Sequence, residues 1–319
     1  MRLNSLSRFT SHVLSTSMLF QLIEIFFNVI APVFALVIIG YFAGPRLSLE
    51  ARTLSRFAYF LLVPSFVFSV MSTATVEAEL ATRMMIYILL VHVACALLGF
   101  FVAWGLGRPA PMIGAYVLIA VFGNVGNFGL PLIEFRLGPD AVVAATVYFL
   151  GIVVIAFVIG VIAASWQKGG SLGAVLAVFK TPALIALPPA LLFNWFDVTP
   201  PLLLSRVTGL LGSAMIPTML IALGVQLSAT KQLKVDVDVV VASGVRLIGG
   251  AVLALLIVVP MGLTGVERGA GIFQSAMPTA VLASIIAIEY DLVPDFVTTA
   301  VLFSTLASVV TLTLLFAFV

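Results

Sequence analysis

The chain has 319 residues, of which 62% are hydrophobic and 9% are charged, and its mean hydropathy is +1.27. Soluble globular chains do not reach these values, so the composition indicates an integral membrane protein. The net charge of +2 gives no indication of a nucleic-acid partner, and the single cysteine, Cys95, excludes an internal disulfide.

Residues 1–19 form an N-terminal tail ahead of the first apolar run. The tail is rich in Ser and Thr, contains Arg2, Arg8 and His12, and has no acidic residue. A targeting signal has this kind of composition. We favour a disordered extension or an upstream start codon, with Met18 as the alternative initiator.

Ten apolar runs follow the tail, each near the ~20 residues that a helix needs to cross ~30 Å of hydrocarbon. A transmembrane β-barrel is disfavoured because the runs are continuously apolar and do not alternate. We therefore predict an all-α membrane protein with ten transmembrane helices, at residues 20–42, 54–73, 83–106, 112–132, 141–165, 180–197, 208–228, 237–261, 268–290 and 294–317. The connecting segments are too short to hold a soluble domain.

The placement of basic residues predicts the orientation, because cytoplasmic loops are enriched in Lys and Arg. With the N-terminus outside, nine basic residues lie on the inner side, namely Arg46, Arg52, Arg56, Arg108, Lys168, Lys180, Lys231, Lys234 and Arg246. The outer side then holds Arg83, Arg136, Arg206 and Arg268, together with the two arginines of the tail. We therefore expect both termini to lie outside.

The two halves of the chain resemble each other at a nearly constant offset. The matched pairs are Pro32 with Pro182, Pro64 with Pro217, His92 with Arg246, and Pro139-Asp140 with Pro294-Asp295. We predict two five-helix repeats, at residues 20–165 and 180–319, joined by a loop at 166–179. Because five is an odd number, the second repeat enters the membrane from the opposite side, and such inverted repeats are typical of transporters.

The fourth predicted helix contains the stretch GNVGNFGLP at residues 123–131. Proline lacks an N–H and glycine relaxes the backbone, so this stretch frees polar backbone groups that lipid cannot satisfy. The repeat offset places Gly123-Asn124 opposite Pro278-Thr279, which lie within QSAMPTA at residues 274–280 of the ninth helix. We interpret the two stretches as matched helix breaks that line a cavity near the middle of the membrane.

Two broken helices would direct half-helix amino ends into this cavity, each with roughly +0.5 of a unit charge, and an anion would be the natural ligand. Alternatively, the Gly, Pro and Asn residues serve only helix packing. We assign substrate binding to Asn124, Asn127, Gln274, Ser275 and Thr279, and maintenance of the breaks to Gly123, Gly129, Pro131 and Pro278.

Three ionisable residues within the predicted helices are further candidates for coupling or anion attraction. Arg246 could snorkel to the inner interface, pair with a carbonyl of a broken helix, or attract an anion. His92 could titrate in a proton-coupled cycle or stay neutral between helices, and Glu24 could be an interfacial residue or a coupling group. His92 and Cys95 share a helix face, but two ligands make a poor metal site, so we expect no metal and no other cofactor.

These motifs resemble those of the auxin efflux carrier family, which includes plant auxin exporters and bacterial carriers such as malonate transporters. The resemblance covers nearly the whole chain from about residue 20. It rests on residues 123–131, on MIPTMLIALG at residues 215–224, and on AMPTA at residues 276–280 with Glu289-Tyr290.

The resemblance implies a ten-helix, NhaA-like fold in which helices 1, 2, 6 and 7 form a dimerising scaffold and helices 3–5 and 8–10 form a moving transport domain. Helices 4 and 9 would cross at their breaks and hold the substrate. Asn124 and Pro278 match residues of the plant members at this crossing, whereas Gly123 stands where those members have a proline. The long cytoplasmic loop of many plant members is missing, which is typical of a compact carrier of a bacterial inner membrane.

We therefore expect a secondary active or potential-driven transporter of a small organic anion, such as malonate, malate or an auxin-like carboxylate, that works by elevator-type alternating access. Its partners would be the anion, the lipid bilayer, a second copy of the chain, and H⁺ or Na⁺ if transport is ion-coupled. A ligand-binding receptor or a channel on the same fold is the alternative. An enzyme is disfavoured because the sequence has no GxSxG or HExxH motif and only two histidines.

Overall fold

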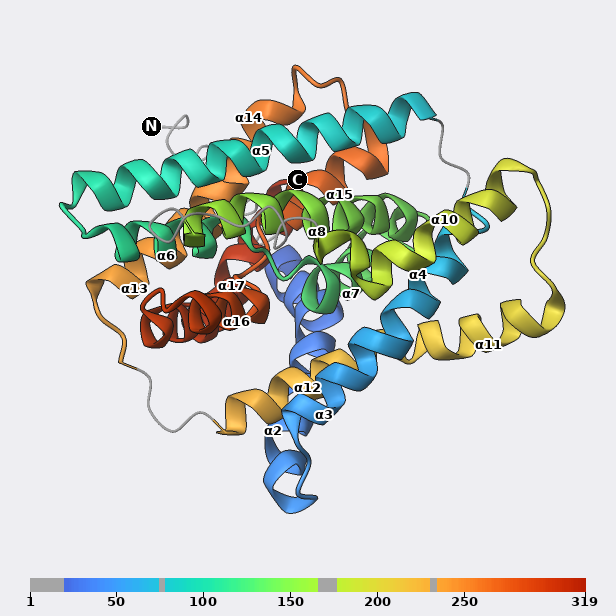
Figure 1. Cartoon of the computed structure of the whole chain (residues 1–319), viewed down its shortest axis with the longest axis horizontal. Helices are drawn as coiled ribbons and strands as arrows, with labels where there is room; N and C mark the ends of the chain where they lie inside the picture. Colours follow the sequence, from blue (N-terminus) through green and yellow to red (C-terminus); the bar gives the residue numbers. More distant parts are fainter. Residues whose placement is uncertain (1–19, 75–77, 166–176, 230–233) are drawn as a thin grey trace, which may run out of the picture.

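The computed structural model describes residues 20–74, 78–165, 177–229 and 234–319 (Figure 1). The predicted tail at residues 1–19 and most of the predicted loop at 166–179 lie outside this part of the chain. Within it, every regular element is a helix, apart from one isolated β-bridge. This confirms the prediction of an all-α chain.

Seven helices in the described part of the chain are long and apolar enough to cross a membrane. They span Phe20–Arg46, Ala51–Met71, Ala78–Gly105, Ala141–Gly160, Leu202–Ala229, Val237–Val258 and Pro294–Phe318. Two shorter apolar helices cover Ala110–Val121 and Pro182–Trp195. The protein is therefore an integral, multi-pass membrane protein.

Three of the ten predicted helices correspond to shorter or interrupted elements. The run at 112–132 corresponds to α6 (Ala110–Val121), η3 (Val125–Gly129) and the start of α7 (Leu130–Leu137). The run at 180–197 corresponds to the end of η4 (Ala177–Lys180) and to α10 (Pro182–Trp195). The run at 268–290 corresponds to α15 (Gly265–Ser275) and α16 (Val281–Tyr290). Hydropathy does not mark such interruptions, because an extended apolar stretch is as hydrophobic as a helical one. The ten-helix arrangement in two inverted repeats stays a prediction.

The helices pack in two groups (Figure 1). One group contains α2 (Ala31–Arg46), α3 (Ala51–Phe57), α4 (Val63–Met71), α10, α11 (Leu202–Ser213) and α12 (Met215–Ala229). The other contains α5 (Ala78–Gly105), α6, α7, α8 (Ala141–Ser165), α13 (Val237–Gly244), α14 (Gly250–Val258), α15, α16 and α17 (Pro294–Phe318). In Figure 1, α5 runs above α6, α8 and α15, while α2, α3 and α12 lie below them.

Prolines explain three of the four π-helical turns found in the described segments. The turns η1 (Phe26–Ile30), η2 (Ala58–Leu62) and η3 each end two residues before Pro32, Pro64 and Pro131, respectively. A proline has no N–H to donate and its ring displaces the carbonyl one turn earlier, so the helix widens locally at that point. The fourth turn, η5 (Val245–Gly249), contains no proline and carries Arg246.

Glycines bring α2 and α12 into close backbone contact in the first group. A Cβ atom on Gly224 would overlap the carbonyl oxygen of Val37, and one on Gly40 would overlap the carbonyl oxygen of Ile221. In lipid, where apolar burial gives little driving force between helices, such small residues allow the van der Waals contact that holds helices together.

We expect Gly224→Ala to lower the thermal stability of the purified protein, because overpacking a close helix contact costs about 1–3 kcal/mol. Thermal unfolding in detergent, followed by tryptophan fluorescence, would measure the loss. Gly209→Ala is the matched control on α11, since a Cβ atom there meets no atom within 4 Å. Equal midpoints for the two variants would contradict this account of the contact.

Candidate functional site

The two interrupted helices touch at their breaks. Gly123 and Thr279 form an antiparallel β-bridge, in which the N–H of Asn124 donates to the oxygen of Pro278 and the N–H of Ala280 donates to the oxygen of Phe122, both at 2.7 Å. These bonds satisfy backbone groups that the breaks release from the helices, as the membrane interior requires. The two breaks predicted from the sequence are therefore in direct contact.

Four helix ends meet at this crossing. The carboxyl ends are those of α6, at Val121, and α15, at Ser275. The amino ends are those of the continuous segment η3–α7, which begins at Val125, and of α16, which begins at Val281. The carboxyl ends carry partial negative charge and the amino ends partial positive charge, roughly half a unit each.

The Arg246 side chain offsets the partial negative charge of the two carboxyl ends. It is 0% exposed, and its Nε donates to the oxygen of Met277 at 2.8 Å, its Nη1 to the oxygen of Ala120 at 2.8 Å, and its Nη2 to the oxygen of Gln274 at 3.4 Å. The guanidinium thus joins the end of α6 to the end of α15. Of the three positions open to this side chain from the sequence, the structure shows pairing with carbonyls of the broken helices.

Gly123 makes room for that guanidinium. A Cβ atom built on Gly123 would overlap Nη2 of Arg246 and lie 3.0 Å from its Cζ. A side chain at position 123 and the observed pose of Arg246 are therefore mutually exclusive. The glycine at this position thus has a steric reason in this chain.

Asn124 lies at the amino end of η3 with an unpaired donor. Its side chain is 4% exposed, and its Nδ2 has no hydrogen-bond partner in the described part of the chain. The residue occupies the N-cap position, yet its side chain does not cap the helix. Asn127, one turn further along, is partly exposed. Two amides thus stand at a positively polarised helix end.

The second break is held by bonds within the protein. The Thr279 hydroxyl donates to the oxygen of Ile119 at 3.3 Å, and the backbone N–H of Thr279 donates to Oγ of Ser304 at 3.1 Å. The Ser275 hydroxyl donates to the oxygen of Gly271, so the 2.7 Å contact with Tyr148 must be donated by the tyrosine. Both hydroxyls predicted to bind substrate are therefore already engaged.

Gln274 joins the second break to α8 and approaches the first. Its Nε2 donates to the oxygen of Ala145 at 3.4 Å, while its Oε1 is buried with no partner among the described residues. A Cβ atom on Gly129 would overlap that Oε1. Gly129 therefore allows the carboxamide to lie directly against η3.

Glu24 and His92 take no part in the breaks themselves, although the His92 ring lies beside Tyr148, with centroids 5.8 Å apart. The His92 Nδ1 donates to the oxygen of Ile88 at 2.7 Å and its Nε2 is buried without a described partner, an arrangement that suits a neutral ring. Glu24 is exposed near the start of the first long helix. Neither contributes to the bonds that hold the crossing.

Sequence reasoning missed Tyr148 and Ser304, which support the second break from α8 and α17. Each is a hydroxyl in a predominantly apolar helix, and such residues are common without any functional role. Only the contact with the break distinguishes them. The sequence signal for Ser304 is weak, since Thr305 and Ser308 are equally buried and bond to their own helix.

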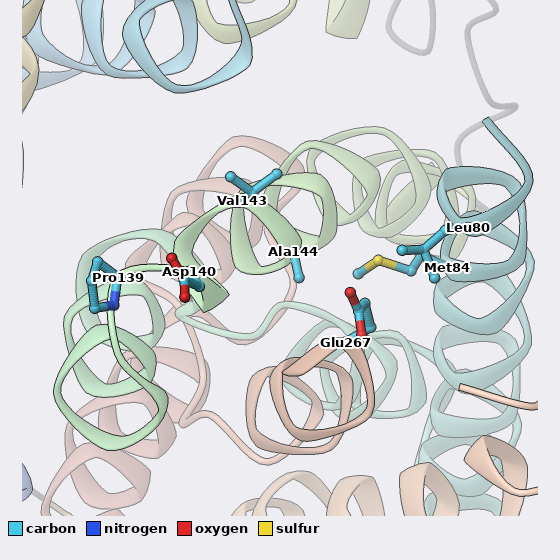
Figure 2. A pocket seen from close by; sticks show the side chains of 7 residues that line it. All are labelled: Leu80, Met84, Pro139, Asp140, Val143, Ala144 and Glu267. Atoms are coloured by element: carbon cyan, nitrogen blue, oxygen red, sulfur yellow. The ribbon is translucent and has the colours of Figure 1, made fainter. Parts of the chain in front are cut away.

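A separate cavity of about 280 Å³ lies away from the crossing (Figure 2). Its lining comes from the starts of α5, α8 and α15 and comprises Leu80, Met84, Pro139, Asp140, Val143, Ala144 and Glu267. None of the predicted site residues lines it. Its two carboxylates would repel an anion, so it does not match the predicted ligand.

A multi-pass helical fold with two broken helices crossing in its interior is typical of membrane transporters. The chain matches the family described as Membrane transport protein over residues 25–172 and 171–316. It belongs to that family, the auxin efflux carrier family.

Relatives in two archaea share most of the chain. It is 27% identical to an uncharacterised transporter of Methanothermobacter thermautotrophicus over 293 residues, which cover 88% of this chain and 94% of that protein. It is 24% identical to an uncharacterised transporter of Methanocaldococcus jannaschii over 300 residues, or 90% of this chain and 96% of the relative. The family is one of transporters and not of enzymes, as the sequence predicted.

We expect Gly123→Ala to displace the Arg246 guanidinium and to destabilise the protein by about 1–3 kcal/mol, as overpacking does. Thermal unfolding would be compared with that of Gly244→Ala, because a Cβ atom on Gly244 meets no atom within 4 Å.

A double-mutant cycle isolates the contact between the two residues. In an Arg246→Gln background the shorter side chain no longer fills the space, so the added methyl group of Gly123→Ala should cost less. Equal costs in the two backgrounds would contradict the steric coupling.

Proposed function

We propose that the protein is a secondary active or potential-driven carrier of a small organic anion, a carboxylate of the malonate, malate or auxin-like kind. It would work by elevator-type alternating access around the crossing. The observation that carries this proposal is the unpaired amide donor of Asn124 at a helix amino end inside the membrane.

The charge distribution at the crossing supports an anionic substrate. Arg246 is bonded to carbonyls at the ends of α6 and α15, whereas the amino ends of η3–α7 and α16 have no buried acidic partner among the residues whose burial is described. A carboxylate near Asn124 would accept hydrogen bonds from its amide and lie in the positive field of both amino ends.

The candidate residues then divide by role. Asn124 and Asn127 would donate to the anion. Gln274, Ser275 and Thr279 would hold the opposite wall, since their polar groups already bond to α8, α15 and α6. Gly123, Gly129, Pro131 and Pro278 would maintain the two breaks.

The grouping of helices supports movement of the crossing as one body. The bonds of Arg246 join η5 to the two breaks, and Ala145 and Ser304 attach the second break to α8 and α17, all within one group. We propose that this group is the transport domain and that the group containing α2 and α12 is the scaffold. The ring of Phe34 on α2 contacts that of Phe128 in η3, with centroids 5.4 Å apart, and this contact would slide during transport.

Several features of the complete carrier follow the sequence predictions. The two matched segments of the family meet at residues 171–172, within the loop predicted to join two inverted repeats, which supports that division. We propose ten membrane passages, a homodimer through the scaffold, an N-terminus outside, and residence in a bacterial inner membrane. The bonding of His92 suits a neutral ring, which favours transport driven by the membrane potential or the anion gradient over coupling to H⁺.

We expect labelled uptake of malonate, malate, short monocarboxylates or indole-3-acetate into proteoliposomes, and its loss in Asn124→Ala, because the variant removes the free donor. Asn124→Asp should reduce uptake at least as strongly, since a carboxylate would occupy the positive field and repel the substrate. Asn194→Ala is the control, because Asn194 bonds to the carbonyl of Ala74 in the other helix group.

Saturable uptake that is stimulated by unlabelled anion on the opposite side would support a carrier. Linear, unsaturated flux would support a channel, and binding without flux a receptor. Wild-type uptake by both Asn124 variants would remove this residue from the site. Imposed H⁺ and Na⁺ gradients in the same vesicles would show whether either ion is co-transported.

A further inference from the structure

Arg246 gives the crossing an excess positive charge. Two carboxyl ends and two amino ends meet there, and their partial charges of roughly half a unit cancel as a set. The guanidinium adds one full charge, and it forms neither of the two ion pairs found among the described residues. The buried polar residues of the described chain include no Asp or Glu.

The neighbours of Arg246 do not change this balance. Among the described residues, His92, Cys95 and Tyr148 are titratable groups close enough to Arg246 to affect its electrostatics. All three are buried. A charged form of any of them would require a partner for its charge in the buried interior, and the second ring nitrogen of His92 has no partner in the described structure. The empty site therefore carries a net charge near +1.

We infer that the crossing is matched to a single negative charge, so that the substrates of this carrier are monoanions and the loaded site is electrically neutral. This inference rests on the proposed anion transport. A dianion would leave one negative charge uncompensated in the membrane interior, and a neutral molecule would leave the positive charge of Arg246, and both states are costly. Two-charge acids such as malonate would be carried as their singly charged forms.

A second consequence concerns the membrane potential. In alternating access the charges of the site cross part of the electric field together with the substrate. The loaded site would then reorient without moving net charge, and the empty site would move the charge of Arg246. Exchange of one monoanion for another uses only the loaded form, so its rate should not respond to the potential, whereas net uptake should.

The first experiment compares two probes of similar size that differ by one charge, malonate and its monomethyl ester. Labelled exchange would be measured in proteoliposomes with the same probe on both sides, at about pH 8, where free carboxyl groups are ionised. We expect the ester to exchange roughly tenfold faster or more, and its rate to be unchanged when a potassium diffusion potential is imposed. Faster exchange of malonate, or ester exchange that depends on the potential, would overturn the inference.

Variants test whether Arg246 is the source of the charge. Arg246→Lys keeps the charge and should keep the preference for the ester. Arg246→Gln removes the charge, so its remaining exchange should lose the preference and become dependent on the potential. Arg136→Gln is the matched control, since Arg136 also donates to a carbonyl at a helix end, that of Phe316 at 2.9 and 3.2 Å, but lies outside the crossing.

The outcomes separate this inference from the proposed function. Exchange with the opposite charge preference would overturn the inference and leave anion transport standing. An absence of uptake of both probes and of the wider panel, in protein shown to be folded, would overturn both. If Arg246→Gln does not fold, the wild-type measurements decide the question, because they require no variant.

Discussion

The bonding of one buried arginine to the ends of two helices is the constraint on which the interior of this protein depends. A guanidinium in the middle of a membrane protein is costly unless its donors are satisfied and its charge is balanced. Here three carbonyl oxygens, from Ala120, Gln274 and Met277, satisfy the donors and offset part of the charge, because they lie at the negative ends of the helix dipoles. The same bonds hold α6 and α15 in place without a continuous helix through either break.

Most of the remaining polar groups at the breaks have hydrogen-bond partners within the protein, but not all of them do. The β-bridge between Gly123 and Thr279 pairs the extended backbone segments, and Ser304 accepts the N–H of Thr279. Most side chains at the second break are likewise engaged within the protein. Two carboxamide atoms differ, since Nδ2 of Asn124 and Oε1 of Gln274 are buried and unpaired in the described chain, and of the two only Nδ2 is a donor. Unpaired buried donors are uncommon and costly, so one at a helix amino end favours a ligand that completes its bonding.

The carboxyl and amino ends at the breaks therefore differ in how their partial charges are compensated. The carboxyl ends bind the fixed positive charge of Arg246. The amino ends have only the neutral amide of Asn124, which could donate hydrogen bonds to an anion but supplies no negative charge of its own. A carrier must release its substrate, and a neutral donor holds a carboxylate less strongly than a fixed cation at contact distance would. Under the proposed function, the placement of Arg246 on the carboxyl ends would give the site positive charge without placing that charge against the substrate.

Much of this protein could be predicted from its sequence, because membrane insertion imposes strong and local requirements. Composition alone placed the chain in the bilayer, prolines and glycines marked where helices break, and the nearly constant offset between halves paired Gly123-Asn124 with Pro278-Thr279. These features depend on residue type and spacing along the chain. The sequence could not decide among the three possible roles of Arg246. Snorkelling, carbonyl pairing and anion contact are all compatible with an arginine at this position in the eighth predicted helix.

Only the tertiary structure decided which groups face one another. It placed the guanidinium against Gly123, bonded Ser275 and Thr279 within the protein, left Asn124 with a free donor, and added Tyr148 and Ser304 to the surroundings of the breaks. Hydrogen bonds between residues more than a hundred positions apart depend on how helices are rotated and crossed, and a single sequence does not contain that geometry in local form. The sequence thus determined the membrane class and the position of the breaks, whereas three-dimensional packing determined which of their polar groups are unpaired.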